Sequence, residues 1–162
     1  MSFVIGIDPG ISGAIAIFED GKLDTILDMP TLKIASGKTM KSHISAIGLV
    51  RILETWTLVS DGQAHVVMER VGALPGNGSV SMFNFGRSAG IIEGVVAALQ
   101  RPYTYVTPQT WTKGVGRAAG KDASRMRAME LFPTRADLFK RAKDDGRADA
   151  ALIAYWYITK NA

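Results

Sequence analysis

The sequence contains no cysteine, and its two histidines, His43 and His65, lie far apart in the chain. The lack of cysteine excludes disulfides, thiolate nucleophiles, iron–sulfur clusters and zinc sites built on sulfur, and two distant histidines do not make a histidine-rich metal site. Any metal ion bound by this chain must therefore be held by oxygen atoms.

Long apolar runs are also missing. No run reaches the ~18 residues that a membrane-spanning helix needs. The N-terminal residues MSFVIGIDPG contain neither a cationic leader nor a small-residue cleavage site. We therefore expect a cytoplasmic protein that has no membrane partner.

The 162 residues are 47% apolar and 21% charged. This composition lies in the ordinary globular range, and a chain of about 100 to 200 residues usually forms one domain. We expect a single domain over residues 1–162.

The basic residues are concentrated in the C-terminal part of the chain. Residues 1–100 contain seven basic and nine acidic side chains, whereas residues 101–162 contain twelve basic and six acidic ones, for a net charge of +4 overall. An uneven basic surface is typical of nucleic-acid binders, because Lys and Arg replace the counterions of a phosphate backbone. The alternative is a basic surface that serves only solubility.

Hydrophobic patterning predicts the order of the elements. Strands are expected at residues 3–8, 13–18, 22–29, 64–68 and 103–107, and the first three of them are expected to be antiparallel. Helices are expected at residues 41–59, 80–100, 123–131 and 146–159. Gly-, Ser- and Lys-rich segments predict a surface loop at 31–41 and a mobile loop at 72–79. The order β-β-β-α-β-α-β-α indicates an α/β fold of the ribonuclease H-like type, a mixed sheet flanked by helices.

Acidic residues stand where apolar elements end. Asp8 and Glu69 follow strands that should be buried, where a charge is costly unless it is paired or metal-bound. Asp145 and Asp149 are one helical turn apart and share a helix face. The rest of that helix is apolar and must pack on the sheet. These acids are therefore predicted to form a cluster of four carboxylates.

Clustered carboxylates repel one another, which raises their pKa values or recruits hard divalent cations such as Mg²⁺ or Mn²⁺. Two such ions suit phosphodiester hydrolysis, in which they activate water and stabilise the leaving oxygen. Simpler explanations remain for two of the four residues. Asp8 is equally compatible with a turn, and Asp145 with a charge that favours a helix N-terminus.

Several motifs carry a family resemblance over nearly the whole chain. They are GIDPG at 6–10, VMERV at 67–71, FGRSAG at 85–90, GVG at 114–116 followed by Lys121, and ADAALIA at 148–154. In these motifs the chain resembles the RuvC-type Holliday junction resolvases, particularly the phage-encoded ones. The resemblance implies a metal-dependent endodeoxyribonuclease that makes paired cuts in four-way DNA junctions as a homodimer, without a nucleotide cofactor. By position, the metal ligands would be Asp8, Glu69, Asp145 and Asp149.

The sequence departs from the pattern of bacterial members at three places. Their last two acids are three residues apart, whereas Gly146 occupies that position here, so that Asp145 or Asp144 takes the role. Their aromatic residue after the strand-end Glu is replaced by Gly72. A second family lysine has no clean counterpart, because Lys113 is displaced.

Phe83 and Phe85 are alternative candidates for stacking on DNA bases. Their spacing is also compatible with positions in the core.

Lys121 precedes a predicted helix start and is a candidate phosphate contact that also assists the transition state. Arg70 and Arg87 adjoin the Glu69 strand end and the loop expected to face DNA. Other basic residues either extend a DNA-binding track or are ordinary surface charges: Lys113, Arg117, Arg125, Arg141, Lys143 and Arg147.

Small residues recur every four positions in the second predicted helix, at Gly86, Gly90, Gly94 and Ala98. Such a ladder allows close helix packing, either on the helix at 41–59 or across a homodimer interface. The resemblance favours the interface.

Three other functions compete with a junction resolvase. A two-domain ATPase of the same fold needs a much longer chain and a second phosphate loop. A non-catalytic junction-binding protein would not need all four acids. A nuclease with broader specificity for forks, flaps and other branched DNA remains open.

Overall fold

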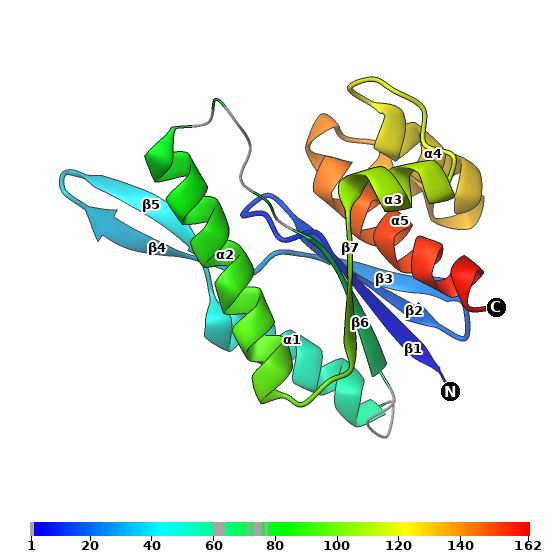
Figure 1. Ribbon diagram of the computed structural model, residues 1–162, viewed down its shortest axis with the longest axis horizontal. Coiled ribbons are helices and arrows are strands. Elements are labelled where there is room, and N and C mark those ends of the chain that lie inside the picture. Colours follow the sequence, from blue (N-terminus) through cyan, green and yellow to red (C-terminus); the bar gives the residue numbers. More distant parts are fainter. Residues whose placement is uncertain (1, 60–63, 71, 73–75, 77) are drawn as a thin grey trace.

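A five-stranded mixed sheet forms the centre of the molecule (Figure 1). The structure is a computed structural model, and it describes residues 2–59, 64–70, 72, 76 and 78–162. Strands β1 (Phe3–Ile7), β2 (Ala14–Glu19) and β3 (Lys22–Asp28) are antiparallel neighbours. Strands β6 (Ala64–Glu69) and β7 (Tyr103–Val106) extend the sheet on the other side of β1 and run parallel to it. The predicted α/β fold with a mixed sheet is confirmed.

Helices cover both faces of this sheet (Figure 1). Helices α1 (Ala46–Val59) and α2 (Ser79–Ala98) lie on one face. Helices α3 (Pro108–Gly114), α4 (Ala123–Leu131) and α5 (Asp145–Lys160) lie on the other. Short 3₁₀ helices, Pro133–Phe139 and Ala142–Asp144, connect α4 to α5. Within the described residues, no helix is long and apolar enough to cross a membrane.

Successive side chains along each strand point to opposite faces of the sheet and so form two separate hydrophobic cores. Ile15 and Ile17 of β2 are buried on the α1 and α2 side, whereas Ala16 and Phe18 are buried on the α5 side. Because successive strand residues point to opposite faces, the same rule places Asp8 and Glu69 on the α5 side of the sheet. This geometry fixes where their carboxylates meet.

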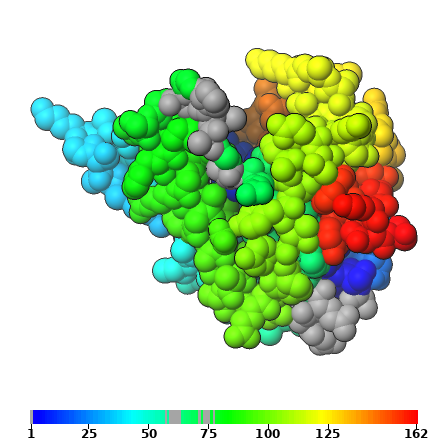
Figure 2. All heavy atoms as spheres, viewed as in Figure 1, coloured from blue at the N-terminus to red at the C-terminus, as the bar shows by residue number. Residues whose placement is uncertain are grey.

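The surface loop predicted for residues 31–41 is wrong. Strands β4 (Thr31–Ser36) and β5 (Thr39–Ile44) form a separate two-stranded hairpin, which projects from the body of the molecule (Figures 1 and 2). The predicted helix start at residue 41 is wrong for the same reason, since α1 begins at Ala46. Every residue of β4 is exposed, so the hairpin lacks the buried apolar face that would have marked it as strand.

Three predicted helices, at 80–100, 123–131 and 146–159, are confirmed to within two residues. Helix α3 was not predicted. Its start is set by Thr107, whose hydroxyl accepts a hydrogen bond from the Thr110 backbone N–H, and by Pro108 in the first turn. The loop predicted at 72–79 falls largely outside the described residues, and Ser79 already belongs to α2.

Candidate active site

Asp8 and Glu69 lie at the same edge of the sheet. Asp8 directly follows β1, and Glu69 is the last residue of β6. The two strands are parallel neighbours with Ile7 opposite Met68, so both carboxylates emerge at adjacent strand ends. The predicted positions of Asp8 and Glu69 at strand ends are therefore confirmed.

Helix α5 crosses β1 at very short range because of Gly6. A Cβ atom at Gly6 would lie 2.1 Å from the backbone oxygen of Ala150, so no other residue fits there without movement. This close approach brings Asp149, one residue before Ala150, to the carboxylates at the strand ends. The electrostatic interaction of Asp149 with both Asp8 and Glu69 follows from this placement.

The pKa values of all three carboxylates are raised, in each case mainly by burial. Burial raises the pKa of Asp8 well above its usual value, and the charges of Asp149 and Glu69 add to the shift. Burial likewise raises the pKa of Glu69 and that of Asp149. For Asp149, Ser124 and Arg117 oppose the effect of burial, while Asp145 adds to it. Repulsion of this kind favours a bound cation.

One oxygen of this cluster has no partner in the described structure. Asp149 Oδ1 is buried and makes no hydrogen bond. A buried carboxylate oxygen without a donor is costly unless a cation or a proton satisfies it. This atom is therefore the clearest structural sign of a ligand at the site.

Asp145, and not Asp144, belongs to the cluster. Asp144 is 1% exposed, and Arg141 Nη2 donates to its Oδ1 at 2.7 Å. Burial would raise the pKa of Asp144, but hydrogen bonds from the Arg141 side chain and backbone hold it below its usual value. Asp145 instead stands one turn before Asp149 on α5 and contributes to the raised pKa of that residue. Of the two alternatives left open by the sequence, this placement favours Asp145.

Position 146, three residues before Asp149, cannot hold an acid. A Cβ atom at Gly146 would lie 2.3 Å from the backbone oxygen of Ser12 and 3.1 Å from Asp8 Oδ2. The turn after β1 therefore packs directly on the first turn of α5. This contact explains why the acid stands four residues, and not three, before Asp149.

Neighbouring side chains hold the carboxylates in place. Trp111 Nε1 donates a hydrogen bond to Glu69 Oε1 at 2.8 Å, which lowers the pKa of Glu69 and partly offsets its burial. Arg125 Nε donates to Asp145 Oδ1 at 2.9 Å, and the same guanidinium also binds Asp122. Trp111 was not predicted as a site residue, because Thr107 and Pro108 were interpreted as the end of a strand and not as the start of a helix.

The predicted DNA-contacting residues are distributed unevenly around this site. Arg125 is only 12% exposed and is engaged by its two carboxylates. Arg117 Nε donates to Ser124 Oγ at 2.5 Å, beside Asp149. Lys113 and Lys121 are exposed, and neither forms an ion pair within the described part of the chain. Lys121 lies in the turn before α4, next to a surface depression.

On the α2 side, Phe83 is 69% exposed and is therefore not a core residue. Phe85 is half-buried. Arg70 and Arg87 are exposed, and Arg87 Nη1 lies 3.3 Å from His43 Nδ1 of the hairpin. Phe83, Arg70 and Arg87 are thus available to a ligand from solvent.

The carboxylates are neighbours but do not enclose an ion in their present rotamers. Among the described residues, no three acidic or histidine side chains stand close enough to hold a metal ion. The donor set is nevertheless all-oxygen and negatively charged, which is the chemistry that Mg²⁺ and Mn²⁺ prefer.

No protein-family model matches the chain. Among curated proteins it is similar to the chloroplastic Holliday junction resolvase MOC1 of Chlamydomonas reinhardtii, with 34% identity over 85 residues, which are 51% of this chain. The chain spans about a tenth (10%) of the length of this relative. The similarity agrees with the resemblance seen in the motifs.

Solved structures show the same fold. RuvC of T. thermophilus in complex with a Holliday junction substrate matches with a TM-score of 0.60 and 15% identity, over 99% of this chain and 95% of that chain. Another Thermus thermophilus RuvC structure gives a TM-score of 0.58 at 14% identity, over 98% and 96%. The yeast mitochondrial Holliday junction resolvase Ydc2 gives a TM-score of 0.56 at 17% identity, over 97% of this chain and 78% of that chain. The chain therefore has the RuvC-type, ribonuclease H-like fold.

Proposed function

We propose that this protein is a metal-dependent endonuclease that resolves four-way DNA junctions. The observation that carries the proposal is the meeting of Asp8, Glu69 and Asp149 at one sheet edge, where burial raises the pKa of all three carboxylates. The similarity to a junction resolvase and the fold shared with RuvC support junction DNA as the substrate.

Asp8, Glu69, Asp145 and Asp149 are the proposed ligands of Mg²⁺ or Mn²⁺. The buried, unpartnered Oδ1 of Asp149 supports this assignment, as does the purely carboxylate donor set. Two divalent ions at such a site would supply water activation and stabilisation of the leaving oxygen in phosphodiester hydrolysis.

The chain's own residues have separate roles in this proposal. Trp111 orients Glu69, and Arg125 orients Asp145. The exposed Lys121 binds a backbone phosphate near the N-terminus of α4 and adds positive charge where the transition state gains negative charge. Arg70, Phe83, Arg87, Lys113 and Arg117 are proposed DNA contacts.

A homodimer is part of the proposal. Helix α2 buries Ser88, Ile92, Val95 and Val96, whereas Gly86, Gly90 and Gly94 lie on its exposed face. A Cβ atom at any of these glycines would meet nothing within 4 Å. The ladder therefore does not pack on α1, and this face is left for a second copy. Two sites related by a two-fold axis suit paired cuts in a symmetric junction.

The decisive experiment compares DNA substrates. Purified protein is incubated with labelled four-way junction, replication fork, flap and linear duplex, with Mg²⁺ or with a chelator, and the cuts are mapped. We expect symmetric cuts in the junction that require Mg²⁺ and disappear in Asp149→Asn. Equal cutting of forks and flaps would indicate a broader branched-DNA nuclease. Binding without cutting under any metal would contradict the enzymatic proposal.

A further inference from the structure

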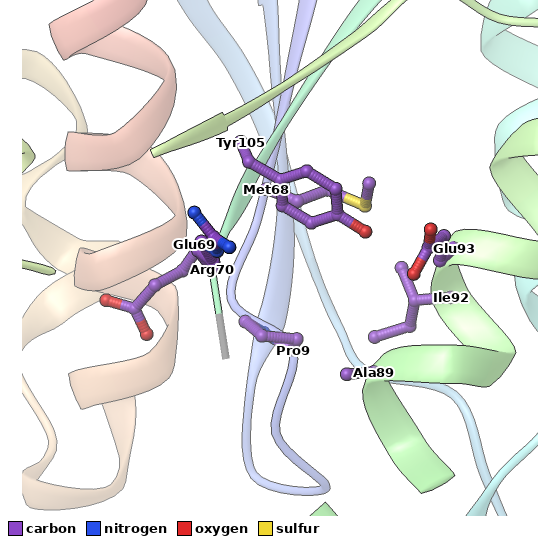
Figure 3. Close-up of a pocket in the computed structure, with 8 residues that line it drawn as sticks. All are labelled: Pro9, Met68, Glu69, Arg70, Ala89, Ile92, Glu93 and Tyr105. Carbon is purple, nitrogen blue, oxygen red and sulfur yellow. The ribbon is translucent and has the colours of Figure 1, made fainter. Parts of the chain in front are cut away.

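A cavity of about 310 Å³ opens at the sheet edge that carries Asp8 and Glu69, but on the α2 side of the strands (Figure 3). Its apolar lining comes from Pro9, Met68, Ala89 and Ile92. Met68 and Ile92 also belong to the core on this face, so this wall is held by packing. The four carboxylates of the proposed active site do not fill the cavity, because the side chain of Glu69 points away from it toward the opposite face (Figure 3).

Polar groups converge on the remaining wall of the cavity. The hydroxyl of Tyr105 points toward the carboxylate of Glu93 on this wall (Figure 3). Burial, followed by the hydrogen bond to Glu93 and its charge, raises the pKa of Tyr105 to about 12. The phenol therefore stays protonated and can act as a hydrogen-bond donor, while the carboxylate of Glu93 can accept a hydrogen bond from a ligand.

The shape and chemistry of the cavity suit a small flat ring. Its volume lies at the lower end of the roughly 300 to 1,000 Å³ that small-molecule sites occupy. Its walls combine apolar side chains, one aromatic ring and a carboxylate acceptor, while Arg70 adds a positive charge at the rim next to Glu69. This is the combination that holds an unstacked nucleobase, through apolar and aromatic contact with its face and a hydrogen bond to its edge.

We propose that this pocket receives one unstacked nucleobase from the strand that is cut, adjacent to the scissile phosphate. The proposal rests on the proposed function, and it deepens it by naming a base-reading site. Residues 68–70 and Pro9 connect the two faces of the edge, so a strand whose phosphate lies at the carboxylates can direct its neighbouring base over the edge to Glu93 and Tyr105.

The acceptor in the pocket predicts which bases fit. Adenine, cytosine and guanine each present an amino group that can donate to the Glu93 carboxylate. Thymine presents an imide N–H between two carbonyl oxygens, which a carboxylate repels. The pocket should therefore favour an amino-bearing base and disfavour thymine beside the cut.

The first test measures cleavage of four junctions that differ only in the nucleotide next to the cut. For the wild-type protein we expect kcat/KM to be about tenfold lower with thymine than with the best amino-bearing base, which is within the range of one good base contact. In Glu93→Gln the amide can both donate and accept, and the difference should shrink to less than about twofold. Glu93 is exposed, so the substitution leaves the core intact.

The matched control is Asp137→Asn, which removes the same charge from an exposed position on the far 3₁₀ helix and should preserve the wild-type preference. Junction cleavage in which Glu93→Gln leaves the base preference unchanged would overturn the pocket while leaving the proposed function intact. Absence of cleavage by the wild type would overturn both.

The second test does not depend on cleavage. The fluorescent base 2-aminopurine is placed on either side of the cut in a junction bound by Asp8→Asn, and its emission rises when it leaves the stack. We expect a rise at one of the two positions that is lost when Ala89→Phe fills the cavity. Melting followed by circular dichroism checks that this variant is folded. No rise at either position would overturn the proposal.

Discussion

Asp8 is buried beside two other acids, and this placement has a cost in the protein without metal. Its raised pKa means that the folded chain binds a proton there more tightly than the unfolded chain does. The stability of the metal-free protein should therefore fall as the pH rises from about 4, the ordinary pKa of an aspartate, through the raised pKa. Cations that bind the cluster would remove this destabilisation.

Asp8→Asn removes one of the repelling charges and keeps the shape of the side chain. In the presence of a chelator at neutral pH, we expect its Tm to lie about 2 to 4 °C above that of the wild type, which corresponds to about 1 kcal/mol for a chain of this size. Mn²⁺ should raise the Tm of the wild type but not that of the variant. Thermal melts across pH measure both effects, and a lower Tm for the metal-free variant would contradict the electrostatic account.

In the proposed mechanism Trp111 acts on the chemistry through Glu69, so its substitution should separate catalysis from stability. Trp111→Phe keeps a ring in the core but loses the hydrogen bond to Glu69 Oε1. We expect kcat to fall by about 10- to 100-fold, the usual effect of losing a contact that orients a metal ligand. Because the bond lowers the pKa of Glu69, its loss should also move the acidic limb of the pH–rate profile to higher pH.

Trp156→Phe is the matched control for this experiment. Trp156 is also buried and packs against Gly114, but its indole does not hydrogen-bond to a carboxylate in the described structure. We expect Trp156→Phe to lower the stability of the protein about as much as Trp111→Phe does, but to keep kcat near the wild-type value. Equal kinetic defects in the two variants would show that Trp111 acts only by packing.

Single residues of the site were predictable to different degrees. The positions of Asp8, Glu69 and Asp149 could be predicted because each stands at the end or in the first turns of an apolar element with clear periodicity. The choice between Asp144 and Asp145 required coordinates, since it depends on arginines that engage Asp144. Trp111 is 42 residues from Glu69 in the sequence, and no local pattern connects them.

At the level of elements, the hairpin β4–β5 is the main departure from the sequence prediction. The central strands were recognisable because they are continuous apolar runs, buried on both faces, or because apolar and polar residues alternate along them. The hairpin has almost no buried side chains. Its three lysines, Lys33, Lys38 and Lys41, suggested a loop. Gly37, with φ of 60°, marks the turn between the strands, but this signal alone does not distinguish a hairpin from a loop.

The exposed hairpin should be the least stable element of the described fold. Two-stranded hairpins without packing are marginal in water, because few apolar contacts offset the loss of chain entropy. We expect backbone amides of residues 31–44 to exchange at least about a thousandfold faster than those of β1 and β6, which open only with the whole domain. Hydrogen exchange followed by mass spectrometry measures this ratio, and comparable protection would indicate a packing partner for the hairpin.

On the scale of the whole molecule, several arginines of the C-terminal part of the chain form ion pairs within the chain. Arg125, Arg141 and Arg147 pair with Asp145, Asp144 and Asp28, respectively. Charge counting therefore overestimated how many arginines can face DNA. The exposed Lys113 and Lys121 remain on the α3 and α4 side, and Arg70 and Arg87 on the α2 side. A DNA molecule crossing the carboxylate edge would meet both groups.

In the proposed dimer, the exposed face of α2 would set how the two active sites are arranged, and this interface can be tested without disturbing the subunit. Figure 2 shows α2 along the surface, and a side chain at Gly90 would meet no atom of its own chain within 4 Å. Gly90→Glu should therefore preserve or slightly increase subunit stability, since glycine is a poor helix former by about 1 kcal/mol. In a dimer that packs on this ladder, however, the same glutamate would clash.

We expect light scattering to give about twice 17.4 kDa, the mass of a dimer, for the wild type and 17.4 kDa, the mass of a monomer, for Gly90→Glu. Met126→Glu, at an exposed position on α4, should remain dimeric. If the monomeric variant still nicks junctions but no longer makes paired cuts, the two-fold arrangement is what couples the two cuts; a monomeric wild type would refute this interface.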